Sequence, residues 1–297
     1  MPHVAVGVDA GGTSTVAVVA QDGEVLRTRA GGGANASVAG AEAAADTIAT
    51  TILAALDGAL PHAIFVGAAG AGRGDVAATI CAALESRFPS ARIGVRDDAH
   101  IALRASVPEG DGAVLIAGTG SIAYAINGET QTRCGGYGYL VGDEGSGFAI
   151  GSAAVRSALR VLDGRGQRDA LVDAVMARLD AADLSQVLAN LYGGDGVALV
   201  ASLAPVVLEL AGSGERSAAK IVQQAALELS DLAKTAVARA QLQQSSAPLV
   251  LAGSLFSENT LLTFLVETRL KNDLPQMNVY KSRAEPVLGA LAAAQRL

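Results

Sequence analysis

Short apolar runs separated by glycine-rich turns open the chain. One apolar run ends at Asp9, a Gly-Gly-Thr turn follows at residues 11–13, and a second apolar run covers residues 15–20. An Asp-Gly pair at 22–23 then leads into a third short run. Asp-Gly and Asn-Gly pairs between apolar runs are strong signals for β-hairpins. We therefore expect a strand, a glycine-rich bend that carries hydroxyl groups, and a hairpin.

The same pattern returns in the middle of the chain. An apolar run at 113–117 is followed by a Gly-Thr-Gly-Ser turn at 118–121, a second run at 122–126 and an Asn-Gly pair at 127–128. Two copies of one pattern predict two related lobes. Glycine-rich turns with hydroxyl groups suit a phosphorylated ligand gripped between those lobes.

The rest of the chain alternates strand-like and helix-like segments. Further strands are predicted at residues 24–26, 63–67, 92–96, 129–131, 248–252 and 277–280. Helices are predicted at residues 38–57, 75–87, 98–105, 147–162, 167–180, 183–191, 197–211, 214–242, 258–270 and 284–297, the longest of them with an apolar stripe at helical spacing. This order predicts an α/β protein with mixed sheets.

A polar, turn-rich segment at 107–112 is the best boundary between two domains. We expect an N-terminal α/β lobe at residues 1–110 with the first phosphate turn, and a C-terminal α/β lobe at residues 111–297 with the second. An alternative is that the last helix returns to the first lobe.

Composition narrows the classes of function. The 297 residues leave room for two domains, and their net charge of −7, without any basic run, argues against nucleic acid and anionic membrane surfaces as partners. Two cysteines and three scattered histidines form no disulfide framework and no metal-ligand spacing. The N-terminal residues lack the basic and apolar regions of a signal peptide, and no apolar run is long enough to span a membrane. We expect a cytoplasmic enzyme without a membrane partner.

The Gly-Gly-Thr turn is the first candidate for chemistry. Successive backbone N–H groups and a hydroxyl can hold a β- or γ-phosphate, and Asp9 at the end of its strand can hold Mg²⁺ through water. The alternative is a plain hairpin whose glycines serve only its geometry. The second glycine–hydroxyl turn favours the phosphate interpretation.

Asp97 and Asp98 end one predicted strand and begin a helix. One of them can simply cap that helix, which is frequent at such junctions. The functional alternative is a general base, because ligands of open α/β sheets bind at the carboxyl ends of the strands.

Residues 135–147 contain six glycines and the acidic pair Asp143 and Glu144. Paired carboxylates on a glycine-rich loop suit the recognition of several sugar hydroxyls. The alternative is a flexible surface turn, but the aromatic and aliphatic residues at 137–141 predict a packed loop.

A further βα turn contains Gly253 and Ser254 and either faces an adenine or ribose or is an ordinary turn. The two common nucleotide fingerprints, the Walker A loop and the dinucleotide-binding GxGxxG motif, are absent from the sequence.

Taken together, these segments resemble a known family. The matching segments are Asp9–Thr13, Asp98-Ala99, Gly118–Ser121, Gly135–Gly138, Gly142–Ser146 and Ala252–Ser254. In their order and spacing, over nearly the whole chain, they resemble the N-acetylglucosamine kinases, which are grouped with the BadF/BadG/BcrA/BcrD ATPases in the actin and sugar-kinase superfamily. The resemblance implies a two-lobed, ribonuclease H-like α/β fold with duplicated mixed-sheet cores and an interlobe cleft.

The resemblance also implies roles for single residues. Asp98 is implied as the catalytic base, and Asp9 as the residue that holds Mg²⁺ through water. ATP is implied to contact Gly11, Gly12, Thr13, Thr15, Gly118, Thr119, Gly120, Ser121, Gly253 and Ser254. The sugar is implied to contact Asn35, Asp98, Thr119, Cys134, Gly135, Gly136, Asp143 and Ser146. Tyr137 departs from the tryptophan more often expected at that position.

The implied activity is the ATP- and Mg²⁺-dependent phosphorylation of the 6-hydroxyl of N-acetylglucosamine or a close relative. Glucosamine and N-acetylmuramic acid stay open as substrates, and a homodimer is implied only by the resemblance. The alternative of another class is a BadF-type ATPase activator, which needs cysteines for a shared iron–sulfur cluster. Cys81 and Cys134 are far apart in sequence and neither lies in a cluster-like setting.

Overall fold

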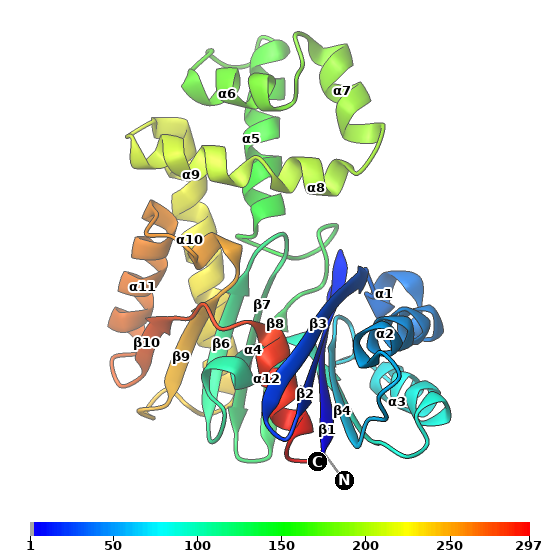
Figure 1. The fold of residues 1–297 in the computed structure, drawn as a ribbon. Helices are drawn as coiled ribbons and strands as arrows, with labels where there is room; N and C mark the ends of the chain where they lie inside the picture. Colours follow the sequence, from blue (N-terminus) through cyan, green and yellow to red (C-terminus); the bar gives the residue numbers. More distant parts are fainter. Residues whose placement is uncertain (1–2) are drawn as a thin grey trace. The chain divides into compact units, whose positions relative to one another are not determined.

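The computed structural model describes residues 3–297, which form two compact units (Figure 1). Unit 1 combines the chain up to Gly110 with the C-terminal segment Ala284–Leu297. Unit 2 comprises Asp111–Arg283. Each unit has its own mixed five-stranded sheet.

The sheet of unit 1 has the strand order β3-β2-β1-β4-β5. Its strands are β1 (Val4–Ala10), β2 (Ser14–Gln21), β3 (Glu24–Gly32), β4 (Ala63–Ala68) and β5 (Arg92–Asp97). The first three are antiparallel, whereas β4 and β5 run parallel to β1. The carboxyl ends of β1, β4 and β5 therefore meet at one edge of the sheet.

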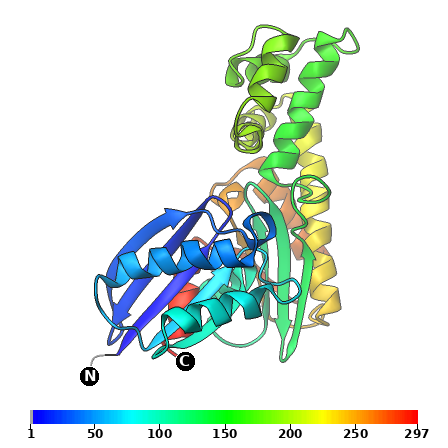
Figure 2. The same ribbon diagram turned by 90° about the vertical axis from the view of Figure 1, so that its right-hand side faces the viewer.

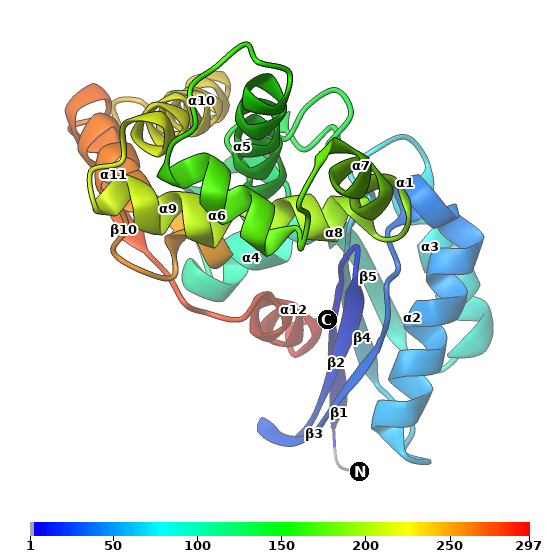
Figure 3. The same cartoon turned by 90° about the horizontal axis from the view of Figure 1, so that it is seen from above.

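Helices cover both faces of this sheet. They are α1 (Ala36–Ala39), α2 (Ala41–Leu56), α3 (Val76–Arg87), α4 (Asp98–Ser106) and α12 (Pro286–Ala294). Figure 3 shows α2 and α12 on opposite sides of the strands. The apolar faces of α2 and α3 pack on one side, and Val287, Leu291 and Ala294 of α12 pack on the other.

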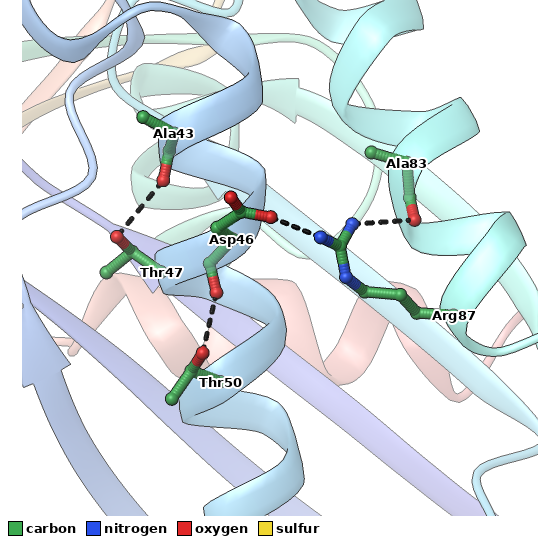
Figure 4. A network of polar contacts seen from close by, with 6 residues as sticks. All are labelled: Ala43, Asp46, Thr47, Thr50, Ala83 and Arg87. Atoms are coloured by element: carbon green, nitrogen blue, oxygen red, sulfur yellow. Dashed lines mark hydrogen bonds and ion pairs between the residues drawn. The ribbon is translucent and has the colours of Figure 1, made fainter.

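An exposed ion pair joins α2 and α3. Arg87 donates to the Asp46 carboxylate and also to the carbonyl of Ala83 in its own helix (Figure 4). Because exposed ion pairs contribute little to stability, the buried alanines and isoleucines beneath them hold the two helices in place.

The sheet of unit 2 repeats the topology of unit 1, with the strand order β10-β9-β6-β7-β8. Its strands are β6 (Gly112–Ala117), β7 (Ser121–Asn127), β8 (Thr130–Gly135), β9 (Pro248–Ala252) and β10 (Asn278–Lys281). As in unit 1, three strands form an antiparallel meander and the next two run parallel to the first. The duplicated hairpin of the sequence is thus the start of two equivalent sheets, and the predicted α/β fold class is confirmed.

Unit 2 carries more helices than unit 1. They are α5 (Gly147–Leu162), α6 (Ala170–Arg178), α7 (Leu184–Tyr192), α8 (Gly196–Ala201), α9 (Ala204–Gly212), α10 (Arg216–Arg239), the 3₁₀ turn η1 (Ser254–Phe256) and α11 (Leu261–Asp273). Figure 2 shows α10 along one face of the sheet. Figure 1 shows α6 and α7 near the end of α5 that is farther from the sheet, whereas α8 and α9 cross the half nearer to it, where Gly151 of α5 meets the Val200 carbonyl.

Several predicted boundaries are wrong for identifiable reasons. The predicted helix at 38–57 is interrupted at Gly40, whose φ is 86°. The predicted helix at 197–211 is two helices, because α9 starts anew with a proline in its first turn. The predicted helix at 258–270 begins only at Leu261, where Thr260 caps it. The place of residues 284–297 was left open by the sequence, and they belong to unit 1.

Over residues 3–297, no single helix is both long and apolar enough to span a bilayer. One pair, α7 with the segment Gly196–Gly212, meets the length and composition requirement only when taken together, and it is bent by 120° at the break.

Candidate active site

The Gly-Gly-Thr turn of unit 1 is held from two sides. The Gly11 N–H donates to the Ser14 carbonyl over 2.9 Å, and the Gly11 carbonyl accepts from the Ala34 N–H over 2.9 Å. A side chain at Gly33 would collide with the Gly12 carbonyl, so the loop after β3 can press against the turn only because position 33 is glycine. Asn35 follows in this loop, and its Nδ2 is 3.9 Å from where a Gly12 Cβ would lie.

The three loops at the edge of this sheet are bonded to one another. The Ala69 N–H after β4 donates to the Ala10 carbonyl of β1 over 2.9 Å, and the Ala69 carbonyl accepts from the Ala36 N–H over 3.1 Å. Gly12 and Thr13 are nevertheless exposed, although the loops around them are bonded to one another. Thr15 differs, because it is fully buried and its hydroxyl has no hydrogen-bond partner among the described residues.

Asp97 and Asp98 have different surroundings at the end of β5. The Asp97 side chain is buried and caps α4, with Oδ1 accepting from the Ala99 N–H and Oδ2 from the Gly72 N–H, both over 3.1 Å. The Asp98 side chain is half-buried, and its Oδ1 accepts from Ala99 over 2.9 Å. Burial, then the charge of Asp97, and to a lesser degree that of Asp9, raise the pKa of Asp98.

Asp9 lies close enough to Asp98 for the two carboxylates to interact. Burial raises the pKa of Asp9 to about 6, and no described side chain donates to it. A carboxylate in that position is a suitable oxygen ligand for Mg²⁺. No group of three or more His, Cys, Asp or Glu side chains within residues 3–297 could form an all-protein metal site. The donor set thus fits a Mg²⁺ ion that is held by one carboxylate together with water and substrate phosphates.

The second turn predicted to bind phosphate, Gly118 to Ser121, lies in unit 2 between β6 and β7. The Gly118 N–H donates to the Gly120 carbonyl over 2.9 Å. On its other side, the carbonyls of Gly118 and Thr119 accept from the N–H groups of Gly147 and Phe148 over 2.7 and 3.2 Å. Thr119 is exposed, whereas Ser121 is buried and its hydroxyl donates to the Glu144 carbonyl over 2.7 Å.

The glycine-rich loop at 135–147 follows directly after β8. Asp143 has a left-handed backbone with φ 58°, and its Oδ2 is 2.8 Å from where a Gly120 Cβ would lie. Burial raises the pKa of Asp143, and the nearby backbone N–H groups of Ser121 and Gly138 act in the opposite direction. Ser146 caps α5 by accepting from the Ala149 N–H over 3.2 Å. Burial also raises the pKa of the Cys134 thiol in the preceding strand, so this thiol is not activated.

The prediction of a packed loop holds for only part of this segment. The Tyr139 ring lies against Phe148 with centroids 5.0 Å apart. Leu140 and Val141, however, are 82% and 80% exposed, and Tyr137 is 59% exposed. The hydrogen bonds at Gly136 and at 143–148, and not the apolar side chains at the tip, fix the loop.

A pocket of about 770 Å³ in unit 2 is lined in part by Gly118 and Thr119 of the second glycine turn. Gly118, Thr119 and Ser254 lie at one end of it, small and aliphatic side chains of α8 and α9 form one wall, and residues 257–261 form another. Gly253 has φ 97°, and a side chain there would collide with the Ala117 carbonyl. The α8–α9 wall could not be predicted from the sequence, because its alanines carry no signal beyond helical spacing.

Each unit thus gathers its own part of the predicted site. Unit 1 brings together Asp9, the turn at 11–13, Asn35 and Asp98. Unit 2 brings together the turn at 118–121, the loop from Cys134 to Ser146, and Gly253 with Ser254. Two equivalent sheets, each with a glycine–hydroxyl turn after its first strand, define a protein of the actin and sugar-kinase fold class.

The comparisons identify the family within this class. The model of the BadF/BadG/BcrA/BcrD ATPase family matches residues 6–294, and the chain belongs to this family. It is 30% identical over 235 residues to the N-acetylmuramic acid/N-acetylglucosamine kinase of Clostridium acetobutylicum, covering 78% of this chain and 77% of that protein. It is 32% identical over 177 residues to the glucosamine kinase GspK of Vibrio cholerae, covering 58% and 60%.

A solved structure is similar along its whole length. It is a candidate N-acetylglucosamine kinase from Chromobacterium violaceum, with a TM-score of 0.79 and 27% identity over 97% of this chain and 98% of that one.

Proposed function

We propose that this protein is an ATP-dependent amino-sugar kinase that phosphorylates the 6-hydroxyl of N-acetylglucosamine or a close relative. The observation that carries the proposal is the half-buried Asp98 beside Asp9 and the exposed Gly-Gly-Thr turn. One relative is named as a kinase of N-acetylmuramic acid and N-acetylglucosamine, and another as a kinase of glucosamine. These names support an amino sugar as the substrate.

Asp98 would act as the general base. Phosphoryl transfer needs mostly alignment and charge neutralisation, and a positioned carboxylate accepts the proton of the attacking hydroxyl. The raised pKa of Asp98 suits this task, because a base works best when its pKa lies near the working pH. Asp97 would keep the base in place by capping the helix on which Asp98 lies.

The two glycine turns would hold the phosphates of ATP through their backbone N–H groups, with Thr13 and Thr119 as hydroxyl donors. Mg²⁺, when bound near Asp9, would neutralise the charge of the β- and γ-phosphates. The pocket of unit 2 beside Ser254 would take the adenosine, because its alanines leave space for a flat ring.

On the sugar side, Asn35, Asp143 and the backbone at Gly135 and Gly136 would bind hydroxyl groups. One observation favours free glucosamine as a second candidate substrate. Burial raises the pKa of Asp143, and Oε2 of the adjacent Glu144 is buried without a described donor. A glucosamine ammonium would compensate such carboxylates better than a neutral acetamide does.

The test measures ADP release with N-acetylglucosamine, glucosamine, N-acetylmuramic acid and glucose, followed by NMR of the phosphorylated carbon. We expect turnover with at least one amino sugar and phosphate on carbon 6. Release of ADP without phosphorylation of any sugar, together with the visible absorption of an iron–sulfur cluster after anaerobic purification, would instead favour the ATPase-activator alternative.

Variants of the two neighbouring aspartates test the assignment of the base. Asp98→Asn should lower kcat by about 100-fold or more, because proton transfer contributes roughly 10²–10⁴-fold. Asp97→Asn is the comparison variant: asparagine still caps the helix, but the loss of the Asp97 charge lowers the pKa of Asp98, so kcat should fall far less than in Asp98→Asn while the acidic limb of the pH–rate profile moves to lower pH. Near-wild-type turnover by Asp98→Asn would show that the base lies elsewhere.

A further inference from the structure

In unit 2, the phosphate turn at 118–121 and the glycine-rich loop at 135–147 are parts of one hydrogen-bonded network. The carbonyls of Gly118 and Thr119 accept from the N–H groups of Gly147 and Phe148. The side chain of Asp143 lies so close to Gly120 that a Cβ there would be 2.8 Å from its Oδ2. Because every contact is short, the turn cannot shift without moving the loop.

Ser121 is the centre of this network, and it is only 3% exposed. Its carbonyl accepts from the Gly136 N–H over 2.9 Å at the start of the loop. Its own N–H lies near the Asp143 carboxylate and lowers the pKa of that carboxyl group. Its hydroxyl donates to the Glu144 carbonyl over 2.7 Å. A single buried residue therefore bonds the loop at two points, Gly136 and Glu144, and lies close to Asp143 between them.

These bonds leave the Ser121 hydroxyl without a proton to donate to a phosphate, since that proton is already directed at Glu144. The hydroxyl instead fixes the backbone between Asp143 and Gly145, where Gly145 has φ 73° and packs so tightly that a Cβ would be 2.6 Å from the Ala225 carbonyl of α10. The segment is thus held between α10 on one side and Ser121 on the other.

We infer that Ser121 is a positioning residue that couples the nucleotide side of the site to the sugar side. A phosphate bound to the turn fixes the backbone of residues 118–121, and Ser121 transmits this order to the loop that carries Asp143. By thermodynamic reciprocity, a sugar bound to Asp143 strengthens nucleotide binding by the same factor. The sugar half of this inference rests on the proposed function.

The first test measures this coupling by calorimetry as the ratio of ADP dissociation constants without and with saturating amino sugar. We expect roughly 5- to 50-fold coupling in the wild-type protein, within the usual range for linked sites. Ser121→Ala should reduce it to about twofold or less, and Ser121→Thr, which keeps the hydroxyl, should restore part of it.

Ser230→Ala is the matched control for the loss of a buried hydroxyl. Ser230 is fully buried in α10, and its hydroxyl donates to the Ala226 carbonyl over 2.7 Å, the same length as the Ser121 bond. Both variants lose one similar hydrogen bond, but only Ser121→Ala should lose coupling. Wild-type coupling in Ser121→Ala, or an equal loss in both variants, would overturn the inference.

The second test needs no sugar, and it separates the inference from the proposed function. Hydrogen exchange is measured with ADP alone, and in the wild type the amides at 136–148 should exchange more slowly when ADP is bound. This protection should be lost in Ser121→Ala and kept in Ser230→Ala. If ADP protects the loop but no amino sugar is phosphorylated, the proposed function fails and the coupling of turn to loop stands. If an amino sugar is phosphorylated but ADP leaves these amides unprotected, the inference alone fails.

Discussion

The two aspartates at the end of β5 are adjacent in sequence, yet the fold uses them differently. Both oxygens of Asp97 accept backbone N–H groups, one from the loop after β4 and one from the first turn of α4. Asp98 keeps part of its surface accessible, and burial and the charge of Asp97 raise its pKa. A partly accessible carboxyl group with a perturbed pKa is a candidate for proton transfer. A carboxylate whose two oxygens already accept backbone N–H groups, as in Asp97, has a structural role instead.

His100, two residues further along α4, provides a pH-dependent prediction. Burial lowers its pKa to about 4, and the charges of Arg104 and Arg96 act in the same direction, while Asp97 opposes them. Its ring also lies against Phe65, with centroids 6.2 Å apart. Because the folded pKa is below the unfolded value of 6.5, the neutral ring favours folding above pH 6.5, and this stability is lost as pH falls towards 4.

His100→Gln should therefore make the unfolding free energy less sensitive to acid. The measurement is urea unfolding of both proteins at several pH values between 7 and 4.5. The difference between their free energies of unfolding should change by about 1–2 kcal/mol over this range. Other groups titrate in the same window, but they are common to both proteins and cancel in the difference. Parallel stability curves would mean that His100 is protonated equally easily in the folded and unfolded states.

At the scale of elements, each sheet begins with a strand, a glycine–hydroxyl turn and a meander, and these features could be predicted from the sequence. The signals are local, because Asp22-Gly23 specifies the β2–β3 hairpin and Asn127-Gly128 the β7–β8 hairpin within a few residues. The division between α8 and α9 and the late start of α11 could not be predicted, since helical spacing continues across both boundaries. Tertiary packing and a single capping threonine decide them.

Gly253, directly after β9, provides a prediction for the turn beside the pocket of unit 2. Its φ of 97° disfavours any side chain, and a Cβ would also collide with the Ala117 carbonyl. Gly253→Ala should lower the free energy of unfolding by roughly 3 kcal/mol or more, because the strained backbone and the steric collision both contribute.

Gly214→Ala is the matched control, because Gly214 has φ 92° but open space around it, and it should cost only about 1 kcal/mol. Chemical denaturation of both variants gives the comparison. Equal costs would show that the backbone conformation alone, and not contact with β6, requires a glycine at 253.

At the scale of the whole molecule, the two units share one topology but differ in what was added to it. Unit 2 inserts the helices α5 to α10 between its meander and β9, whereas unit 1 has two helices between its meander and β4. The predicted site residues lie on short motifs, so each could be assigned to a strand end or a loop from the sequence. The place of Ser121 in a network was not predictable, since its partners at 136, 143 and 144 come together only through the loop backbone.

The return of the last helix to unit 1 was open in the sequence for a similar reason. An alanine-rich helix at 284–297 carries no signal for the sheet that it covers. The structure places it where Gly7 of β1 and Gly289 of α12 allow close backbone contact, with β1 against Leu291 and with α4 through the Ile101 carbonyl. Small residues at both contacts let the helix lie directly on the sheet.

This arrangement predicts that the C-terminal helix stabilises the unit that begins the chain. Leu291 is 5% exposed and packs with residues of β1, β2 and β4, so Leu291→Ala should cost about 2–4 kcal/mol. Hydrogen exchange should rise in β1, β2 and α4, while β6, β7 and β9 keep wild-type protection. Leu270→Ala is the control, because Leu270 is fully buried in the core of unit 2 and should produce the reverse pattern. If both variants loosen both sheets equally, the two units unfold as one cooperative structure and the helix does not stabilise unit 1 selectively.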